Sequence, residues 1–135
     1  MTTAAAAKSD PDLDHKFTGK HNLTLEIAEE NLHNHVTSAI ESSGGCRYWA
    51  EINVHEHQLG WANYFTATFK VTEESSGEAV QGKSYRLSIP KIMKGLAVLA
   101  KKYPHHFCDI LKEDGDATTG DVLVQCALFG DIVYG

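Results

Sequence analysis

The stretch Tyr64-Phe65-Thr66-Ala67-Thr68-Phe69-Lys70-Val71-Thr72 decides the fold of this chain, because apolar and polar side chains alternate along it. A period of two puts every second side chain on the same face of a β-strand. The apolar set is Phe65, Ala67, Phe69 and Val71. We therefore expect a half-buried strand, with one face on a core and the other face toward water.

Two neighbouring runs show the same alternation. In the run Cys46–Val54 we expect Tyr48, Ala50, Ile52 and Val54 to point inward, and Arg47, Trp49, Glu51 and Asn53 to point outward, followed by His55 and His57. In the run 82–89 we expect Tyr85, Leu87 and Ile89 inward, and Ser84 and Arg86 outward. Three neighbouring strands with short connections predict an antiparallel meander.

The remaining segments have helical periodicity. We expect a first helix over 24–42 with Thr24 as its cap, and a second that starts at Ser88 and ends before Pro104. A short helix follows at 104–112, and a last one over 122–134, which is apolar on all sides and therefore central to the core. The predicted fold class is α+β: an N-terminal helix, a three-stranded antiparallel meander, then three C-terminal helices packed on one face of the sheet.

Length and composition indicate one domain. The chain has 135 residues with 12 basic and 18 acidic side chains, a formal net charge of −6. This balance argues against a protein that binds duplex nucleic acid mainly through phosphates, and no apolar run approaches the ~20 residues of a membrane span. We expect a mobile tail over residues 1–20 and a single domain over 21–135. The three cysteines are widely spaced and odd in number, which favours a reducing, cytoplasmic compartment.

The eight histidines of the sequence raise the question of a metal site. On a strand His55 and His57 share a face, so they are the metal-ligand candidates, with Glu51 as a third ligand. A metal-binding module or a metal-dependent enzyme is therefore one alternative function, and exposed histidines on a polar face are the simpler interpretation. Cys46 is a conceivable nucleophile, but no spacing supplies a histidine base for it. We therefore predict no catalytic residue and no cofactor.

The expected outer face of the sheet is the candidate binding surface. Tryptophan and arginine are frequent anchors in protein interfaces, which favours a protein partner. An alternative function is the binding of a small ligand or of single-stranded nucleic acid on the same face. An alternative location for Trp49 is burial, either under a helix or in a homodimer interface. The candidate partner-binding residues are Arg47, Trp49, Glu51, Asn53, Thr66, Thr68, Lys70 and Arg86.

The C-terminal stretch Asp121-Val122-Leu123-Val124-Gln125-Cys126-Ala127-Leu128-Phe129-Gly130-Asp131-Ile132-Val133-Tyr134-Gly135 resembles the ending of small, mostly uncharacterised proteins encoded by phages and prophages. The Tyr48-Trp49-Ala50 motif and the segment 87–104 are similar too. The resemblance implies a bacterial host cytoplasm and an accessory gene, and carries over no catalytic residue. Small acidic phage proteins often bind and block a host protein, including defence components such as CRISPR. The expected function is therefore that of a non-enzymatic phage accessory protein that binds and modulates or inhibits a host or phage protein, through the sheet face or the acidic first helix.

Overall fold

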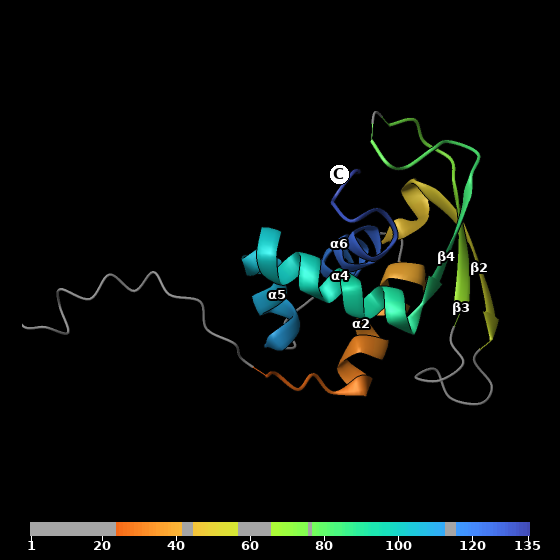
Figure 1. Cartoon of the computed structure of the whole chain (residues 1–135). Helices are drawn as coiled ribbons and strands as arrows, with labels where there is room; N and C mark the ends of the chain where they lie inside the picture. The colour runs from red at the N-terminus through yellow and green to blue at the C-terminus, as the bar shows by residue number, and fades with distance from the viewer. Residues whose placement is uncertain (1–23, 42–44, 57–65, 76, 113–115) are drawn as a thin grey trace, which may run out of the picture.

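The arrangement of helices and strands comes from a computed structural model, which describes residues 24–41, 45–56, 66–75, 77–112 and 116–135 (Figure 1). The expected mobile tail and His57 lie outside these residues. In chain order the described elements are helix α2 (Glu29–Glu41), a 3-10 helix η1 (Cys46–Tyr48), strands β2 (Ala50–Glu56), β3 (Thr66–Val71) and β4 (Ser84–Ser88), and helices α4 (Ile89–Lys102), α5 (Pro104–Leu111) and α6 (Ala117–Phe129). The predicted α+β class, with one helix before the sheet and three after it, is confirmed.

The sheet has the order β2-β3-β4, and both strand pairs are antiparallel, as a meander requires. Ala67, Phe69 and Val71 of β3 are buried together with Leu87 of β4, whereas Lys70 is exposed. The alternation in the sequence thus separates the two faces of the sheet. The inner face packs toward the helices, which all lie on one side of the sheet in Figure 1.

Helix α6 lies at the centre of the core, as its apolar sequence predicts. Nine of its 13 residues are buried, and it packs between α2 and α4. Gly120 permits the close approach to α2, because a Cβ atom at this position would lie 2.2 Å from the backbone oxygen of His35. Among the described helices, none combines the length and the apolar character that crossing a membrane requires.

Several expected element boundaries are wrong. The first helix begins at Glu29 rather than after Thr24. The last helix begins at Ala117 rather than at 122, and its N-cap Asp116 has a carboxylate that accepts a hydrogen bond from the Thr119 N–H at 3.1 Å. The helix ends at Phe129, because the C-cap Gly130 has a φ of 76° in the left-handed region, so residues 131–134 are not helical.

The start of the first strand is also wrong. Residues 46–48 form a 3-10 turn instead of extended chain, and β2 begins at Ala50. A 3-10 turn does not alternate its side chains as a strand does. The predicted orientations of Arg47, Tyr48 and Trp49 are therefore unsupported. Trp49 is fully buried, and Tyr48, expected inward, is 45% exposed.

Candidate functional site

The outer face of the sheet is polar and carries both signs of charge. The strand register places Glu51, Lys70 and Ser84 in one row across β2, β3 and β4, and Asn53, Thr68 and Arg86 in the next. Directly opposite residues in antiparallel strands have their Cβ atoms about 4.5–5.5 Å apart, so each row is a continuous strip of polar side chains. No described helix covers this side of the sheet in Figure 1.

A shallow depression of about 400 Å³ lies on the same face. His55 contributes to its wall and forms a hydrogen bond of 2.6 Å between its Nε2 atom and Thr68 Oγ1. The depression therefore offers hydroxyl, amide, carboxylate and ammonium groups to a partner. Its lining residues are Glu51, Ile52, Asn53, His55, Thr68, Lys70 and Ser84.

Six of the eight expected partner-binding residues share this face. They are Glu51, Asn53, Thr66, Thr68, Lys70 and Arg86. Arg47 is exposed, but it belongs to η1 and stands apart from the rows of the sheet. Trp49 is not on the face at all, so the surface has no tryptophan anchor within the described residues.

The expected metal ligands are only partly described. Within the described residues, no group of three or more His, Cys, Asp or Glu side chains is arranged to hold a metal ion. Glu51 and His55 are four residues apart on β2, which corresponds to about 13 Å along a strand, so the two do not meet at one ion. The register also shifts between Val54 and Glu56, so regular alternation ends at His55. His57 lies outside the described residues.

Trp49 instead belongs to a buried polar cluster around Asp121 of α6. Its indole Nε1–H donates to Asp121 Oδ1 at 2.8 Å, and the Tyr48 hydroxyl donates to Asp121 Oδ2 at 2.9 Å. The side-chain amide of Gln125 also donates to Asp121 Oδ1, at 3.0 Å. Asp121 is 4% exposed and Gln125 is fully buried. Buried polar groups are stable only when hydrogen-bonded, so this cluster fixes η1 and the start of β2 against α6.

The same cluster holds the last residues of the chain. Gln125 Oε1 accepts hydrogen bonds from the backbone N–H groups of Val133 and Tyr134, both at 2.7 Å. The Tyr134 ring is stacked on Trp49 with a centroid distance of 5.4 Å and an angle of 9°. Phe69 of β3 and Phe129 of α6 lie against the same indole at 5.8 and 5.5 Å. Trp49 is therefore the point where the sheet, α6 and the C-terminal residues meet.

The buried thiols have a structural role. Burial raises the pKa of Cys46, and the nearby Asp121 carboxylate raises it further. Burial also raises the pKa of Cys126, to about 12. A nucleophilic cysteine needs a lowered pKa and access to substrate, so neither thiol suits catalysis. Cys108 is exposed on α5.

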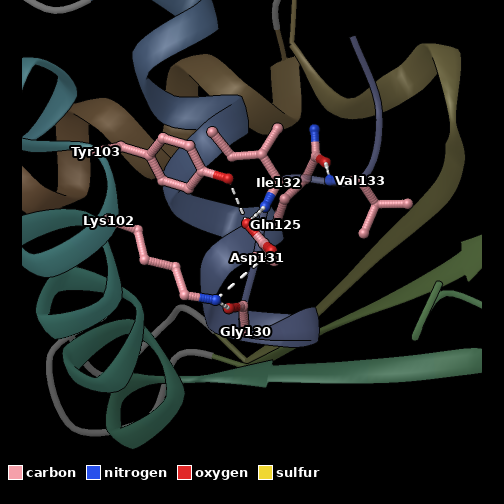
Figure 2. Close-up of polar contacts among 7 residues, drawn as sticks. All are labelled: Lys102, Tyr103, Gln125, Gly130, Asp131, Ile132 and Val133. Atoms are coloured by element: carbon pink, nitrogen blue, oxygen red, sulfur yellow. Dashed lines mark hydrogen bonds and ion pairs between the residues drawn. The ribbon is translucent and has the colours of Figure 1, made fainter.

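A second polar cluster ties the end of α4 to the turn after α6 (Figure 2). The Tyr103 hydroxyl and the Ile132 N–H both donate to Asp131 Oδ1, the latter at 2.8 Å. Lys102 Nζ lies 3.5 Å from Asp131 Oδ2 and donates to the Gly130 carbonyl at 3.3 Å. The hydrogen bond from Tyr103 is the main cause that lowers the pKa of Asp131, and the same bond raises the pKa of Tyr103. This cluster, the clasp, joins Lys102 and Tyr103 at the end of α4 to Gly130 and Asp131 after α6.

The two polar clusters are the features that sequence reasoning missed. Asp121 and Gln125 are a polar pair four residues apart within an otherwise apolar helix, and this pair was the available signal. The donors to Asp121 and Gln125 come from residues 48–49 and 133–134, and those to Asp131 include Tyr103 at the end of α4, so local spacing indicates none of these contacts. No family model matches the chain, and searches of curated proteins and of solved structures found no significant match.

Proposed function

We propose that this chain is a non-enzymatic accessory protein that binds a host or phage protein through the outer face of its sheet. The observation that carries the proposal is the polar face that no described helix covers, on which Lys70 and Arg86 lie among hydroxyl and amide side chains in regular rows. Protein interfaces need not be more apolar than the rest of a surface, and arginine is enriched in them. The resemblance to phage and prophage proteins supports a bacterial host as the setting, with a defence component such as CRISPR as one partner class.

The buried clusters support a binding role rather than a catalytic one. The reactive or polar side chains of Cys46, Asp121 and Gln125 are buried in the core. The hydrogen bonds of Asp121 and Gln125 join elements of the fold. The outer-face side chains of Lys70 and Arg86 are exposed by contrast. A partner that docks there would meet groups that the fold itself does not need.

The same surface is less suited to single-stranded nucleic acid than to a protein partner. Platforms that bind single strands stack bases on aromatic side chains. The described outer face carries no Phe, Tyr or Trp, because Trp49 is buried and Tyr85 points inward beside Phe129 at 5.0 Å. The face has two cationic side chains, Lys70 and Arg86, and Glu51 lies opposite Lys70. Their attraction for a phosphate backbone is therefore weak.

The test compares two charge-reversed variants of the full chain. Lys70→Glu with Arg86→Glu changes the outer face, and Lys94→Glu with Lys101→Glu makes the same change in net charge on the exposed side of α4. A partner is captured from host lysate with the unchanged chain, purified, and titrated against both variants by calorimetry. We expect the outer-face variant to lose at least about tenfold in affinity and the α4 variant to bind nearly unchanged. The reverse ranking would overturn the proposal.

A further inference from the structure

The two edges of the sheet differ in how their backbone groups are used. Thr72 N–H donates to the Trp49 carbonyl at 2.9 Å, so Trp49 and Thr72 form a hydrogen-bonded pair. In an antiparallel ladder such pairs recur at every second residue. The backbone of Glu51 and Asn53 therefore bonds to β3, while the backbone of Ala50, Ile52 and Val54 faces away from the sheet.

The same reasoning applied to the other side shows that β4 is a closed edge. Val71 N–H donates to the Lys83 carbonyl at 3.0 Å, so the backbone of Ser84, Arg86 and Ser88 faces outward. Lys91 Nζ donates to the Arg86 carbonyl at 2.6 Å, and Ser88 leads directly into α4. Lysine at an edge is one of the ways in which proteins prevent further strand pairing.

The β2 edge has no such cover in the part of the chain that the structure describes. No described side chain or loop is hydrogen-bonded to the backbone of Ala50, Ile52 or Val54, and Figure 1 shows β2 as the strand at the far side of β3 from α4. The inward side chains are also incompletely covered here. Ile52 is half-buried and Val54 is 36% exposed, whereas Ala67 and Leu87, on the next two strands, are fully buried. An open edge with apolar side chains is a template for strand addition.

We propose that a second copy of this chain occupies this edge, pairing β2 with β2 in antiparallel fashion about a two-fold axis at Ile52. In this register Ile52 lies opposite Ile52 of the second copy, Ala50 lies opposite Val54, and Glu51 lies opposite Asn53. Apolar residues thus meet apolar residues on the inner side, and no like charges meet on the outer side. The interface is isologous, as two-fold dimers require.

The charge pattern and the regular part of β2 distinguish this register from its neighbours. A two-fold axis at Glu51 would place the two Glu51 carboxylates directly opposite each other, which is destabilising. An axis at Asn53 would pair Ile52 with Val54 of the second copy but would extend the pairing to residues 55 and 56, where the regular register of β2 is interrupted, whereas the axis at Ile52 uses only the regular residues 50–54. The dimer joins two sheets of three strands into one, so that the two outer faces form a single surface with two equivalent binding regions.

The first experiment is sedimentation equilibrium of the full chain up to about 200 µM, a range that detects dimers of modest affinity. The test variant is Val54→Pro, because proline at an outward-facing edge position removes an N–H that β3 does not use. The matched control, Val54→Thr, keeps that N–H. We expect a dimer for the unchanged chain and for Val54→Thr, and a folded monomer for Val54→Pro by circular dichroism. If Val54→Pro does not fold, Val54→Lys replaces it, since an edge lysine also blocks pairing.

A second experiment tests the register itself in a Cys108→Ser background, which removes the exposed thiol. The pair Glu51 and Asn53 is a non-hydrogen-bonded pair in the proposed register, with a Cα separation of about 4.5 Å that a disulfide can bridge. We expect oxidation of a mixture of Glu51→Cys and Asn53→Cys chains to give the mixed disulfide dimer, and either chain alone to give much less. An unchanged chain that is monomeric at 200 µM, or a Val54→Pro variant that dimerises as the unchanged chain does, would overturn the proposal.

Discussion

The cluster around Asp121 and the outer face of the sheet are both polar, yet they have opposite relations to the fold. In the cluster the side chains of Asp121 and Gln125 are almost completely buried and are hydrogen-bonded to η1 and to the last residues of the chain. On the outer face, Lys70 and Arg86 are exposed, and removing them would leave no buried group unpaired. Polar residues inside the protein hold it together, and polar residues outside it are available to a partner.

This difference changes how the C-terminal stretch is understood. Its polar residues Asp121, Gln125 and Asp131 each connect α6 or the following turn to another element. Its aromatic residues Phe129 and Tyr134 pack against Trp49. The conspicuous side chains of the C-terminal stretch are thus explained by folding requirements, and the proposed binding residues lie on the sheet instead.

The largest expected effect comes from Asp121→Ala. The substitution leaves the Trp49 Nε1–H and one Gln125 N–H buried without an acceptor, and each such group costs about 1–3 kcal/mol. We expect the free energy of unfolding to fall by about 3–5 kcal/mol in urea titrations, a large part of the stability of a domain of this size. A loss below about 1 kcal/mol would show that the cluster is not a structural element.

A chain that ends at Ile132 tests the other half of the cluster. It removes both N–H donors to Gln125 Oε1 and the Tyr134 ring that is stacked on Trp49. We expect a loss of about 2–4 kcal/mol, because a buried amide oxygen and an indole face lose their contacts. Trp49 is the only tryptophan left in a Trp61→Phe background, and its fluorescence should shift to longer wavelength as water reaches it. Unchanged emission and stability would place the last residues outside the core.

The sequence predicted the sheet and the central helix well because both depend on local periodicity. Ala67, Phe69 and Leu87 alternate with polar residues, and short connections between neighbouring strands favour the antiparallel meander. Helix α6 has apolar residues on all sides, a pattern that one segment carries by itself. These signals also placed six of the proposed surface residues on the correct face.

Trp49 could not be placed in the same way. Strand alternation would place Trp49 on the same outer face as Glu51 and Asn53. The 3-10 turn at 46–48 interrupts this alternation, so the indole points inward. The acceptor that stabilises this orientation, Asp121, is 72 residues away in the sequence. Contacts between distant segments decide the burial of such a residue, and neither composition nor spacing contains them.

A smaller effect is expected at the clasp formed by Asp131 and Tyr103. The lowered pKa of Asp131 means that the folded state favours the carboxylate, so its contribution is present above the ordinary aspartate range near 4 and is lost as the pH falls through the folded pKa. We expect the Tm of Asp131→Asn to be below that of the unchanged chain at pH 7, and this difference to shrink by pH 3. Both Asp131 and Lys102 have side chains that are 48% exposed, which limits the effect. A difference that stays constant with pH would assign the loss to packing.

The smallest change in stability is expected on the outer face, and it is the sharpest test of the comparison. Asn53→Ala and Lys70→Ala remove exposed side chains, so each should alter the free energy of unfolding by no more than about 0.5 kcal/mol. The same two variants should lower the affinity for the captured partner. The greater loss of affinity is expected for Lys70→Ala, because it removes a charge next to Arg86 on the same face. If either variant instead unfolds as readily as Asp121→Ala, the outer face is itself structural. The distinction between a buried polar cluster that stabilises the fold and an exposed polar face that binds a partner would then fail.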